Sequence, residues 1–316
     1  MSDLLTTVVI CTRNRAAFLE KAVRSVLAQA NERVEILIVD NGSTDDTPAL
    51  AKKFAATDSR VKFFVEMETG LSRARNTALK NAKGEWVIFF DDDAVAESGW
   101  LAAYENFFLE PPNKKAVVVG GAVKPEFEVP LPRWISGVAQ LDLGPKSFCF
   151  PHGNCPWECN FACRRETAIE FGGFDARLGH RGDTAGYREG VDLNLRLQEA
   201  GYESWWLPGA AIRHFIHAKR MNLRWLLPAT FNEGRTVAIQ RMKYRTGGNR
   251  ALYAAGRLLA APFHCAINLF VALVSWPFQS GRTAVKALSR AASVAGLSWE
   301  LLLWIFRGKK NNAIRR

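Results

Sequence analysis

The N-terminal part of the chain alternates short apolar runs with longer segments of helical pattern. The apolar runs are Thr6–Cys11, Val34–Asp40, Val61–Val65, Trp86–Asp91 and Ala116–Val123. The helical patterns between them are Ala16–Ala30, Thr44–Ala56, Ser72–Ala82 and Ser98–Phe108. A short run that is apolar at nearly every position is typical of a strand covered on both faces. Strands that alternate with helices in this way predict a doubly wound α/β unit.

The pattern changes beyond residue 124. Residues 124–160 are irregular and rich in Pro, Trp and Phe, which is typical of loops over a binding site. A helix at Glu189–Ala200, a strand at Glu203–Leu207 and a helix over residues 222–243 are expected next. Glycines at Thr246–Asn249 then break the pattern. We therefore expect a catalytic domain over residues 1–245 and a separate helical region over residues 246–316.

Charge is divided unevenly between these regions. Residues 1–212 hold 24 basic and 29 acidic residues, whereas residues 213–316 hold 18 basic and 2 acidic residues. The balance is −5 in the first region and +16 in the second. A mildly acidic body with a strongly basic tail predicts a phosphorylated ligand, an anionic membrane surface or nucleic acid as partner of the tail.

Polar residues follow the expected strands where each strand ends. The first strand runs into Thr12–Arg15, the second ends at Asp40, and the fourth ends at Asp91–Asp93. Open α/β sheets bind ligands beyond the carboxyl ends of their strands. Three consecutive carboxylates repel one another unless a cation or donor compensates them, and oxygen ligands favour Mg²⁺ or Mn²⁺ held together with substrate phosphates. The alternative interpretation is a solvated acidic turn that caps the next helix.

A further candidate lies at the start of the expected third helix. Arg73 and Arg75 follow Gly70 within the first turn. Backbone N–H groups at a helix N-terminus, with guanidinium groups nearby, suit a phosphate. The alternative is an N-cap serine followed by a solvated basic face.

These motifs, taken in order, resemble those of family 2 glycosyltransferases. The matching segments are VVICTRNR at 8–15, VDNGSTDDT at 39–47, GLSRARNTAL at 70–79, FFDDDA at 89–94, GGFD at 172–175, GVDLNLRLQEAGY at 190–202 and RWLLPATFNEGRT at 224–236. The resemblance covers roughly residues 5–245. It implies a GT-A fold, with a mixed, mainly parallel sheet flanked by helices, and transfer of a sugar from a nucleotide donor with inversion.

The resemblance also implies roles in donor binding. Thr12, Arg13 and Asp40 are expected around the base and ribose, Asp92 toward the ribose, and Arg75 near the phosphates. The nucleotide could be UDP, GDP or dTDP, and Asp40 is compatible with a uracil contact.

A divalent cation, Mg²⁺ or Mn²⁺, is expected on the donor diphosphate. By resemblance, Asp91 and Asp93 would hold it and His214 would complete its ligand set. A cation that bridges both phosphates neutralises the charge that develops on the leaving group, without proton transfer. A lone histidine is more often structural, so the role of His214 rests on the match to the family.

The acceptor hydroxyl needs a general base, and here the chain departs from the family pattern. Many members carry a Glu-Asp pair where this chain has Glu189 and Gly190. Glu189 and Asp192 lie three residues apart at the start of a helix and share a face. We expect Glu189 to be the base, with Asp192 as the second candidate. The alternative is that both simply complement the helix dipole.

The irregular segment offers acceptor contacts. Trp157, Glu158 and Asn160 are expected to contact the acceptor, with a sugar stacked on Trp157, although an ordinary packed tryptophan is an equal alternative. A zinc site formed by His152, Cys155, Cys159 and Cys163 is disfavoured, because Gly153 and Pro156 interrupt the helix that it would need.

The tail predicts attachment to a membrane. Leu258–Gly281 contains no Asp, Glu, Lys or Arg and is about as long as a bilayer-spanning helix requires. Basic clusters flank it on both sides, so a spanning helix would leave one cluster on the wrong side. A monotopic or re-entrant arrangement keeps all of them at the anionic cytoplasmic face of the inner membrane. A spanning helix and an oligomer interface remain alternatives, whereas nucleic acid is disfavoured because aliphatic runs separate the basic residues.

Membrane attachment suggests a polyprenyl-linked saccharide acceptor in cell-surface polysaccharide synthesis. A soluble or protein acceptor is one alternative. Another is a catalytically impaired sugar-nucleotide-binding subunit of a membrane polysaccharide-assembly complex, which Gly190 suggests. A membrane scaffold ranks last, because it would not need the carboxylates at the strand ends.

Overall fold

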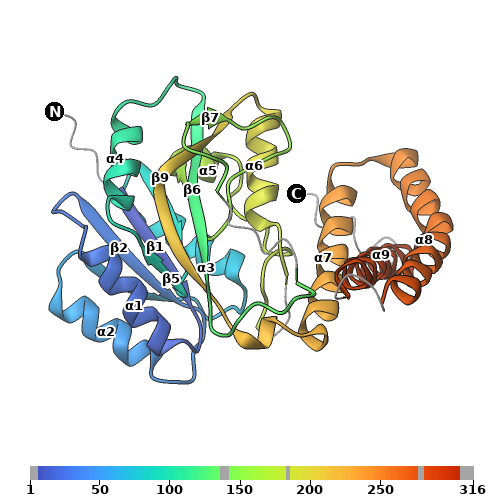
Figure 1. Ribbon diagram of the computed structural model, residues 1–316. Helices are drawn as coiled ribbons and strands as arrows, with labels where there is room; N and C mark the ends of the chain where they lie inside the picture. The colour runs from blue at the N-terminus through green and yellow to red at the C-terminus, as the bar shows by residue number, and fades with distance from the viewer. Residues whose placement is uncertain (1–5, 136–141, 183–185, 277–280, 307–316) are drawn as a thin grey trace. The chain divides into compact units, whose positions relative to one another are not determined.

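The computed structural model describes residues 6–135, 142–182, 186–276 and 281–306 (Figure 1). The chain divides into two compact units. The α/β unit comprises Met1–Glu126, Ala139–Ala176 and Glu189–Ile216, and the helical unit comprises Phe127–Val138, Arg177–Arg188 and His217–Arg316. The helix expected over residues 222–243 thus groups with the tail. The predicted functional division at residue 245 stays a prediction.

A single sheet runs through the α/β unit. Its strands are β1 (Thr6–Thr12), β2 (Val34–Asp40), β3 (Val61–Val65), β4 (Trp86–Phe90), β5 (Ala94–Ala96), β6 (Ala116–Phe127), β7 (Phe148–Cys149), β8 (Asn160–Arg164) and β9 (Glu203–Ile216). Their order is β3-β2-β1-β4-β8-β6-β9-β5, and β7 pairs with β9. The predicted mixed sheet is therefore confirmed.

The two halves of the sheet differ in direction. β3, β2, β1 and β4 pair in parallel, and these are the first four apolar runs of the sequence. β8 then joins β4 antiparallel, with Phe90 opposite Asn160, and β6 joins β8 antiparallel. β5 and β7 pair antiparallel with β9. The parallel strands thus occupy one half of the sheet, and the antiparallel half brings residues from late in the chain to the end of β4.

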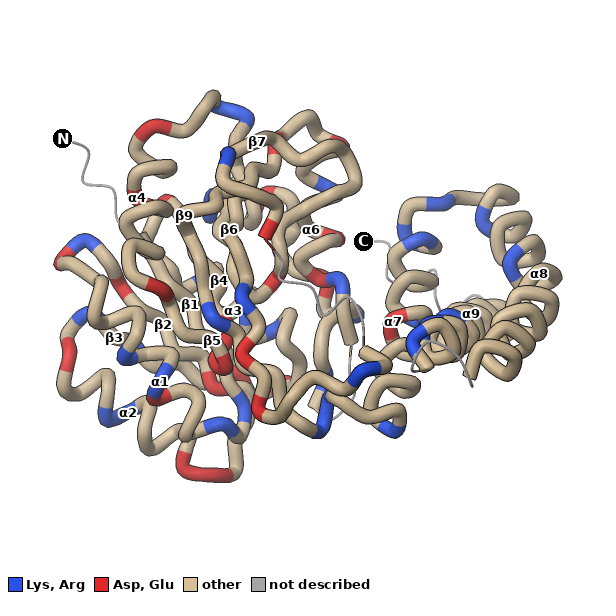
Figure 2. The backbone as a smooth tube through the Cα atoms, viewed as in Figure 1, with Lys and Arg blue, Asp and Glu red and all other residues tan. Residues whose placement is uncertain are grey.

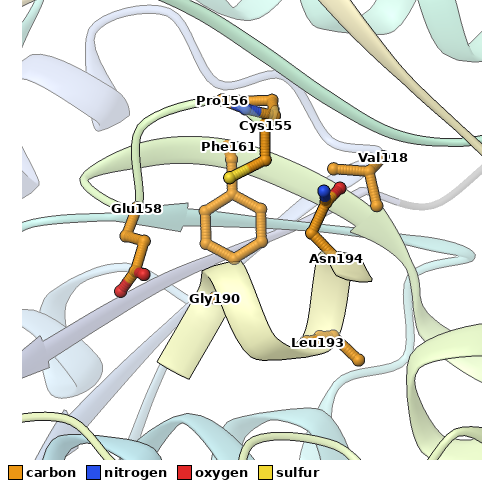
Figure 3. A pocket seen from close by; sticks show the side chains of 8 residues that line it. All are labelled: Val118, Cys155, Pro156, Glu158, Phe161, Gly190, Leu193 and Asn194. Atoms are coloured by element: carbon orange, nitrogen blue, oxygen red, sulfur yellow. The ribbon is translucent and has the colours of Figure 1, made fainter. Parts of the chain in front are cut away.

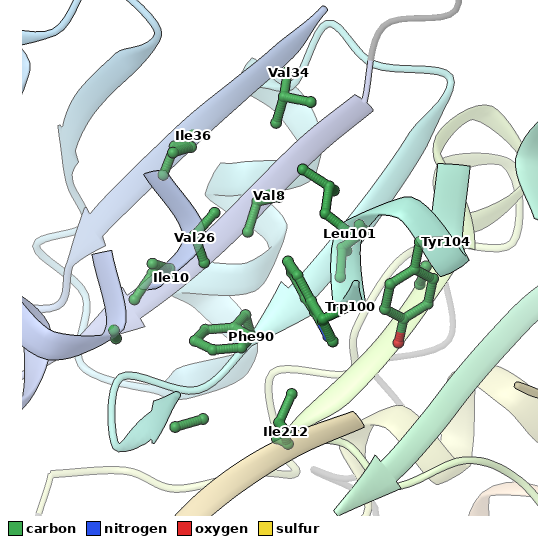
Figure 4. Close-up of a cluster of buried hydrophobic side chains, with 14 of the residues drawn as sticks. Val8, Ile10, Val26, Val34, Ile36, Phe90, Trp100, Leu101, Tyr104 and Ile212 are labelled. Atoms are coloured by element: carbon green, nitrogen blue, oxygen red, sulfur yellow. The ribbon is translucent and has the colours of Figure 1, made fainter. Parts of the chain in front are cut away.

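Helices cover both faces of this sheet. They are α1 (Ala16–Leu27), α2 (Thr47–Thr57), α3 (Leu71–Asn81), α4 (Trp100–Leu109), α5 (Arg165–Glu170) and α6 (Glu189–Glu199). Val8 and Ile10 of β1 pack into the core cluster that includes α1 and α4 (Figure 4), whereas Val9 packs into the cluster that includes α3 and α6. Because side chains alternate across a strand, an almost wholly apolar strand serves both clusters.

The helical unit contains α7 (Leu223–Lys243), α8 (Gly247–Ser275) and α9 (Arg282–Phe306), with the short 3₁₀ helix η1 (Ala218–Arg220) before them. α7 and α9 approach each other closely at two glycines. A Cβ on Gly234 would lie 1.9 Å from the carbonyl oxygen of Ser293, and one on Gly296 would lie 1.8 Å from that of Phe231. Only glycine permits backbones to meet at this distance, so these two residues fix how the helices cross.

α8 is long and apolar enough to cross a bilayer, with a mean hydropathy of 1.9 in its most apolar window. Length and composition alone support that statement. The predicted apolar run Leu258–Gly281 lies largely in this helix, although residues 277–280 fall outside the described part of the chain. The expected break at Thr246–Asn249 is the start of α8, for which Thr246 is the N-cap residue. One apolar C-terminal helix therefore fits the predicted membrane-associating region.

Candidate active site

The acidic turn Asp91–Asp93 lies at the carboxyl end of β4, a central strand of the sheet. β5 leads from this turn and pairs antiparallel with β9, which sets His214 opposite Ala94. His214 Nε2 lies 3.1 Å from an Asp93 carboxylate oxygen and 3.6 Å from one of Asp91. The structure therefore brings together Asp91, Asp93 and His214, which the sequence predicted as the metal site. Figure 2 shows acidic positions gathered beside β5.

Arg15 compensates two of the three carboxylates. Its Nη1 lies 3.0 Å from Asp92 Oδ1 and 2.5 Å from Asp93 Oδ2. The Thr12 hydroxyl donates a hydrogen bond of 2.7 Å to the other oxygen of Asp92. Burial raises the pKa of Asp92 to about 7 against the opposing effect of Arg15. Asp91 is the accessible member of the turn, with 34% of its side chain exposed.

The donor set around Asp91 fits a divalent cation. Asp91, Cys159 and His214 each offer a ligand atom, and these atoms lie within 4.8 Å of one another. Burial alone would lower the pKa of His214. Its contacts with the Asp91 and Asp93 carboxylates outweigh burial and raise the pKa to about 9. The two carboxylates thus favour a positive charge at this position, which a bound cation would supply. The carboxylate ligands suit Mn²⁺ or Mg²⁺, and the imidazole and the cysteine add softer donors.

The loops after β1 and β2 hold each other. Thr12 pairs with Asp40 in the sheet register. In the loops, the Asn14 carboxamide accepts a 2.7 Å hydrogen bond from the Thr44 N–H, and the Asn14 N–H donates to the Ser43 hydroxyl at 2.8 Å. Asn14 has a φ of 54°, a left-handed conformation that asparagine tolerates better than most residues.

Two residues of this region have capacity left for a ligand. Arg13 Nε and Nη1 are buried and find no acceptor among the residues that the structure describes. Asp40 is buried at the end of β2 and accepts a hydrogen bond from the Ser43 N–H. Because a buried donor without an acceptor costs free energy, Arg13 is suited to bind an anion or a carbonyl oxygen.

Arg75 lies between three carboxylates. Its Nη1 donates to Glu189 Oε1 at 2.9 Å and lies 3.5 Å from a Glu158 carboxylate oxygen. Its Nη2 donates to the Glu158 carbonyl at 2.9 Å and lies 3.6 Å from Asp91 Oδ1. One guanidinium therefore links the acidic turn to the start of α6.

Aromatic rings enclose the same guanidinium. The Arg75 carbon Cζ lies 5.6 Å, 5.9 Å and 5.5 Å from the ring centroids of Phe89, Phe161 and Phe174. These distances are within the range of cation–π attraction. The side chain is 3% exposed, so we expect Arg75 to act through the carboxylates that it holds rather than by direct contact with donor phosphates.

The two predicted bases are both buried. Asp192 has no exposed side-chain surface and lies 3.0 Å from Arg196 Nε. Glu189 is 3% exposed, and its Oε2 finds no hydrogen-bond donor among the described residues. Burial, reinforced by the nearby charge of Glu158, raises the pKa of Glu189 well above its ordinary value, against the attraction of Arg75. Neither side chain presents an oxygen to a ligand at the surface.

The predicted acceptor residues separate into two groups. Trp157 is exposed, and Glu158 is partly exposed. Asn160 is fully buried, where its amide NH₂ donates to the Ala122 and Ala210 carbonyls and its oxygen accepts from Trp100 and Tyr104. Asn160 therefore ties β8 to its neighbours, and the predicted acceptor contact is wrong because the side chain has no exposed atom.

A small cavity lies beside the start of α6. Its volume is about 10 Å³, which is room for about one water molecule. Figure 3 labels the residues that line it, among them Glu158, Gly190 and Asn194. Gly190 has no side chain, and the Glu158 side chain stands over it.

Sequence reasoning missed two contributors to the site. Arg15 was read as part of a polar strand end, yet three adjacent carboxylates already required a nearby cation. Cys159 was considered with His152, Cys155 and Cys163, whereas the described residues group it with Asp91 and His214. Cys163 lies on β8, and its side chain is buried in the core cluster that includes α3 and α6. The pairing of β8 with β4 carries the signal for Cys159, and the sequence pattern did not reveal that strand.

The fold and the family agree with the sequence analysis. Similarity to a solved mannosyltransferase from Pyrobaculum calidifontis, in complex with GDP-Man and Mn²⁺, has a TM-score of 0.59 and covers 92% of this chain and 86% of that one, at 19% identity. This likeness defines the GT-A fold. The model of glycosyl transferase family 2 matches residues 7–170, and the chain belongs to that family. It is a glycosyltransferase by family.

Two curated relatives indicate the range of the family. The glucosyl-dolichyl phosphate glucuronosyltransferase of Haloferax volcanii is 26% identical over 252 residues, which cover 75% of this chain and 78% of that protein. The GalNAc(5)-diNAcBac-PP-undecaprenol beta-1,3-glucosyltransferase of Campylobacter jejuni is 36% identical over 98 residues. That match covers 30% of this chain and 32% of the relative.

Proposed function

We propose that this protein transfers a sugar from a nucleotide-sugar donor to a lipid-linked saccharide acceptor, with inversion and with a divalent cation. The observation that carries the proposal is that Asp91, Asp93 and His214 lie together at the carboxyl end of β4. A cation-binding set beyond the carboxyl ends of parallel strands suits a diphosphate.

Donor binding is assigned to the loops after β1 and β2 and to the acidic turn. Arg13 Nε–H and Nη1–H, which find no acceptor in the described part of the chain, support a contact with the base or with a phosphate. Thr12 and Asp40 lie opposite each other in the register, which supports a shared nucleoside pocket. Asp92, held by Thr12 and Arg15, is assigned to the ribose.

Asp91, Asp93 and His214 would hold Mn²⁺ or Mg²⁺. When bound, the cation neutralises charge on the departing diphosphate. Arg15 keeps the Asp93 carboxylate in place from the opposite side, and Arg75 does the same for Asp91 at longer range. The Mn²⁺ in the mannosyltransferase complex supports this assignment.

The helical unit is proposed to attach to the cytoplasmic leaflet of the inner membrane as a monotopic or re-entrant element. Large apolar side chains of α8 are exposed over much of its length, with Leu259 at 74% and Phe263 at 73%. A lipid-linked acceptor, polyprenyl in type and used in cell-surface polysaccharide synthesis, agrees with this attachment. The names of both curated relatives refer to a polyprenyl carrier, which supports the same choice. Trp157 is exposed and available to stack on an acceptor sugar.

A thermal-shift screen tests donor and cation together. The full-length protein is heated with UDP-, GDP- and dTDP-linked sugars, each with and without Mn²⁺. Because a ligand stabilises a protein by binding its folded state, we expect one nucleotide class to raise the Tm, and EDTA to abolish the rise. The Asp93→Asn variant should lose the Mn²⁺-dependent part. The absence of any Tm rise across the panel would overturn the proposal.

The burial of Glu189 and Asp192 favours a second candidate, a sugar-nucleotide-binding subunit without catalysis. Release of nucleoside diphosphate from the donor separates the two. A binding-only protein gives the Tm rise but no turnover, whereas the proposed transferase gives both.

A further inference from the structure

Three carboxylates surround the start of α6, and their exposure differs sharply. The side chain of Glu158 is 23% exposed, that of Glu189 is 3% exposed and that of Asp192 is fully buried. The buried pair is held internally, Glu189 by Arg75 and Asp192 by Arg196. A general base must come within hydrogen-bond reach of the proton that it removes. Of these three side chains, only Glu158 is exposed enough for an acceptor to reach.

Glu158 fills the space that a side chain at position 190 would need. A Cβ placed on Gly190 would lie 2.8 Å from Glu158 Cγ and 3.1 Å from Glu158 Cδ. Carbon atoms do not approach so closely without displacement. The carboxylate that the family pattern leads one to expect from position 190 is missing, and one from another segment of the chain stands in its place (Figure 3).

One hydrogen bond and one ion pair hold the Glu158 carboxylate. Its Oε1 accepts a 3.1 Å hydrogen bond from the Val191 N–H in the first turn of α6. Its Oε2 lies 3.5 Å from Arg75 Nη1, and the same guanidinium lies 3.6 Å from Asp91 Oδ1. Glu158 is therefore held in a fixed relation to the carboxylate assigned to the cation. A general base must be held at a fixed position relative to the donor, even though it does not contact the donor diphosphate.

We propose that Glu158 is the general base and that the absence of a side chain at Gly190 leaves room for it. This inference rests on the proposed glycosyl transfer. The acceptor hydroxyl oxygen forms a bond to the anomeric carbon while the bond from that carbon to the diphosphate oxygen breaks. The bonding pair leaves on the diphosphate oxygen, and the hydroxyl proton passes to the Glu158 carboxylate and then to water. Attack from the face opposite the leaving group inverts the anomeric carbon.

Variants at both positions test the assignment. The probes are the nucleotide sugars of the thermal-shift panel, with Mn²⁺ and a synthetic polyprenyl-diphosphate-linked monosaccharide as acceptor. Glu158→Gln should lower the turnover rate by about 10²- to 10⁴-fold, the usual contribution of a general base. Its Tm rise with donor and Mn²⁺ should match that of the wild type. Glu166→Gln, an exposed glutamate with 79% of its side chain accessible, is the matched control and should keep full turnover.

A reciprocal exchange sharpens the test. Glu158→Gly should be as inactive as Glu158→Gln, and adding Gly190→Asp should recover at least about tenfold, because the new carboxylate enters the space that Glu158 has left. Turnover of Glu158→Gln within threefold of the wild type would overturn the proposal. So would a double variant that binds donor fully yet is no more active than Glu158→Gly. Failure of the wild type itself to bind any donor would instead count against the proposed function.

Discussion

The α/β unit and the helical unit depart from the usual distribution of residues in opposite ways. The α/β unit buries charged side chains, among them Arg75, Asp93 and Glu189, inside an apolar frame. The helical unit exposes large apolar side chains along α8. Charged residues are almost never fully buried unless paired, and large exposed apolar patches mark interaction sites. Each departure therefore indicates a ligand: a charged ligand for the α/β unit and an apolar one for the helical unit.

The buried charged side chains are paired with side chains of opposite charge. Arg15 faces Asp92 and Asp93, and Arg75 faces Glu189. A buried ion pair is weak evidence for stability, because desolvation offsets most of its attraction. Its retention here is better explained by a site that must receive a charged substrate. The apolar face of α8 has no such internal partners, which agrees with a lipid surface as its environment.

The largest expected effect concerns Asp91. Asp91→Asn removes one of the charges assigned to the cation, and we expect the turnover rate to fall by about 10³-fold or more, since metal-ion catalysis is worth several kcal/mol. The variant should fold normally, because Asp91 is the exposed member of the turn and its nearest cationic atoms are 3.6 Å away. Steady-state turnover with saturating Mn²⁺ measures the effect. Asp142→Asn, at an exposed position, is the control, and an equal loss there would remove the special role of Asp91.

The next effect concerns the stability of the α/β unit. Arg75→Met removes a buried guanidinium that donates to the Glu189 side chain and the Glu158 carbonyl and pairs with the Glu158 carboxylate, and we expect the free energy of unfolding to fall by about 3 kcal/mol or more. Arg73→Met on the same helix is the control. Arg73 is 33% exposed and pairs with the exposed Glu68, so its loss should cost less than about 1 kcal/mol. Urea denaturation measures both. Equal losses in the two variants would show that burial of the arginine side chain does not determine the loss of stability.

A smaller effect is expected for the helical unit. Phe263→Glu places a charge on the exposed face of α8, and we expect binding to phosphatidylglycerol–phosphatidylethanolamine vesicles to weaken by at least about tenfold. Met67→Glu is the control, because Met67 is 79% exposed but belongs to the α/β unit. Co-sedimentation with vesicles measures both variants. Vesicle binding of Phe263→Glu equal to that of the wild type would show that the exposed apolar side chains of α8 do not form the membrane contact.

The parallel half of the sheet and the meeting of Asp91, Asp93 and His214 could be predicted because their signals are local or ordered along the chain. Buried parallel strands are apolar at nearly every position, and their carboxyl ends meet at one edge, so Asp40 and the Asp91–Asp93 turn had to lie near each other. β8 was missed because Asn160–Arg164 is a strand of five residues with polar ends. Without β8, the placement of Cys159 and the burial of Asn160 could not be foreseen.

The base could not be predicted for a different reason. Spacing along α6 predicts that Glu189 and Asp192 share a face, but exposure depends on what packs against the helix. Arg75 and three phenyl rings come from other segments and bury that face. The contact between Glu158 and Gly190 joins residues far apart in the sequence, and a missing side chain gives no signal of what takes its place.

The smallest effect concerns the pH dependence of stability through Glu189. Burial raises the pKa of this carboxyl in the folded protein, so the folded state binds its proton more tightly than the unfolded state does. The associated stability is fully present below the ordinary glutamate pKa of about 4.3 and is lost as the pH rises toward the folded-state pKa. Glu189→Gln cannot ionise and should not show this loss.

Urea denaturation at several pH values between 5 and 8 measures the difference. Relative to Glu189→Gln, the wild type should become less stable as the pH rises through this window. Glu166→Gln, with its side chain 79% exposed, should follow the wild-type curve at every pH. If the curves of the wild type and Glu189→Gln ran parallel, the charge of Glu189 would not be suppressed by its surroundings. Glu189 would then again be a candidate for the base, and the contrast between a buried and an accessible carboxylate at the start of α6 would lose its force.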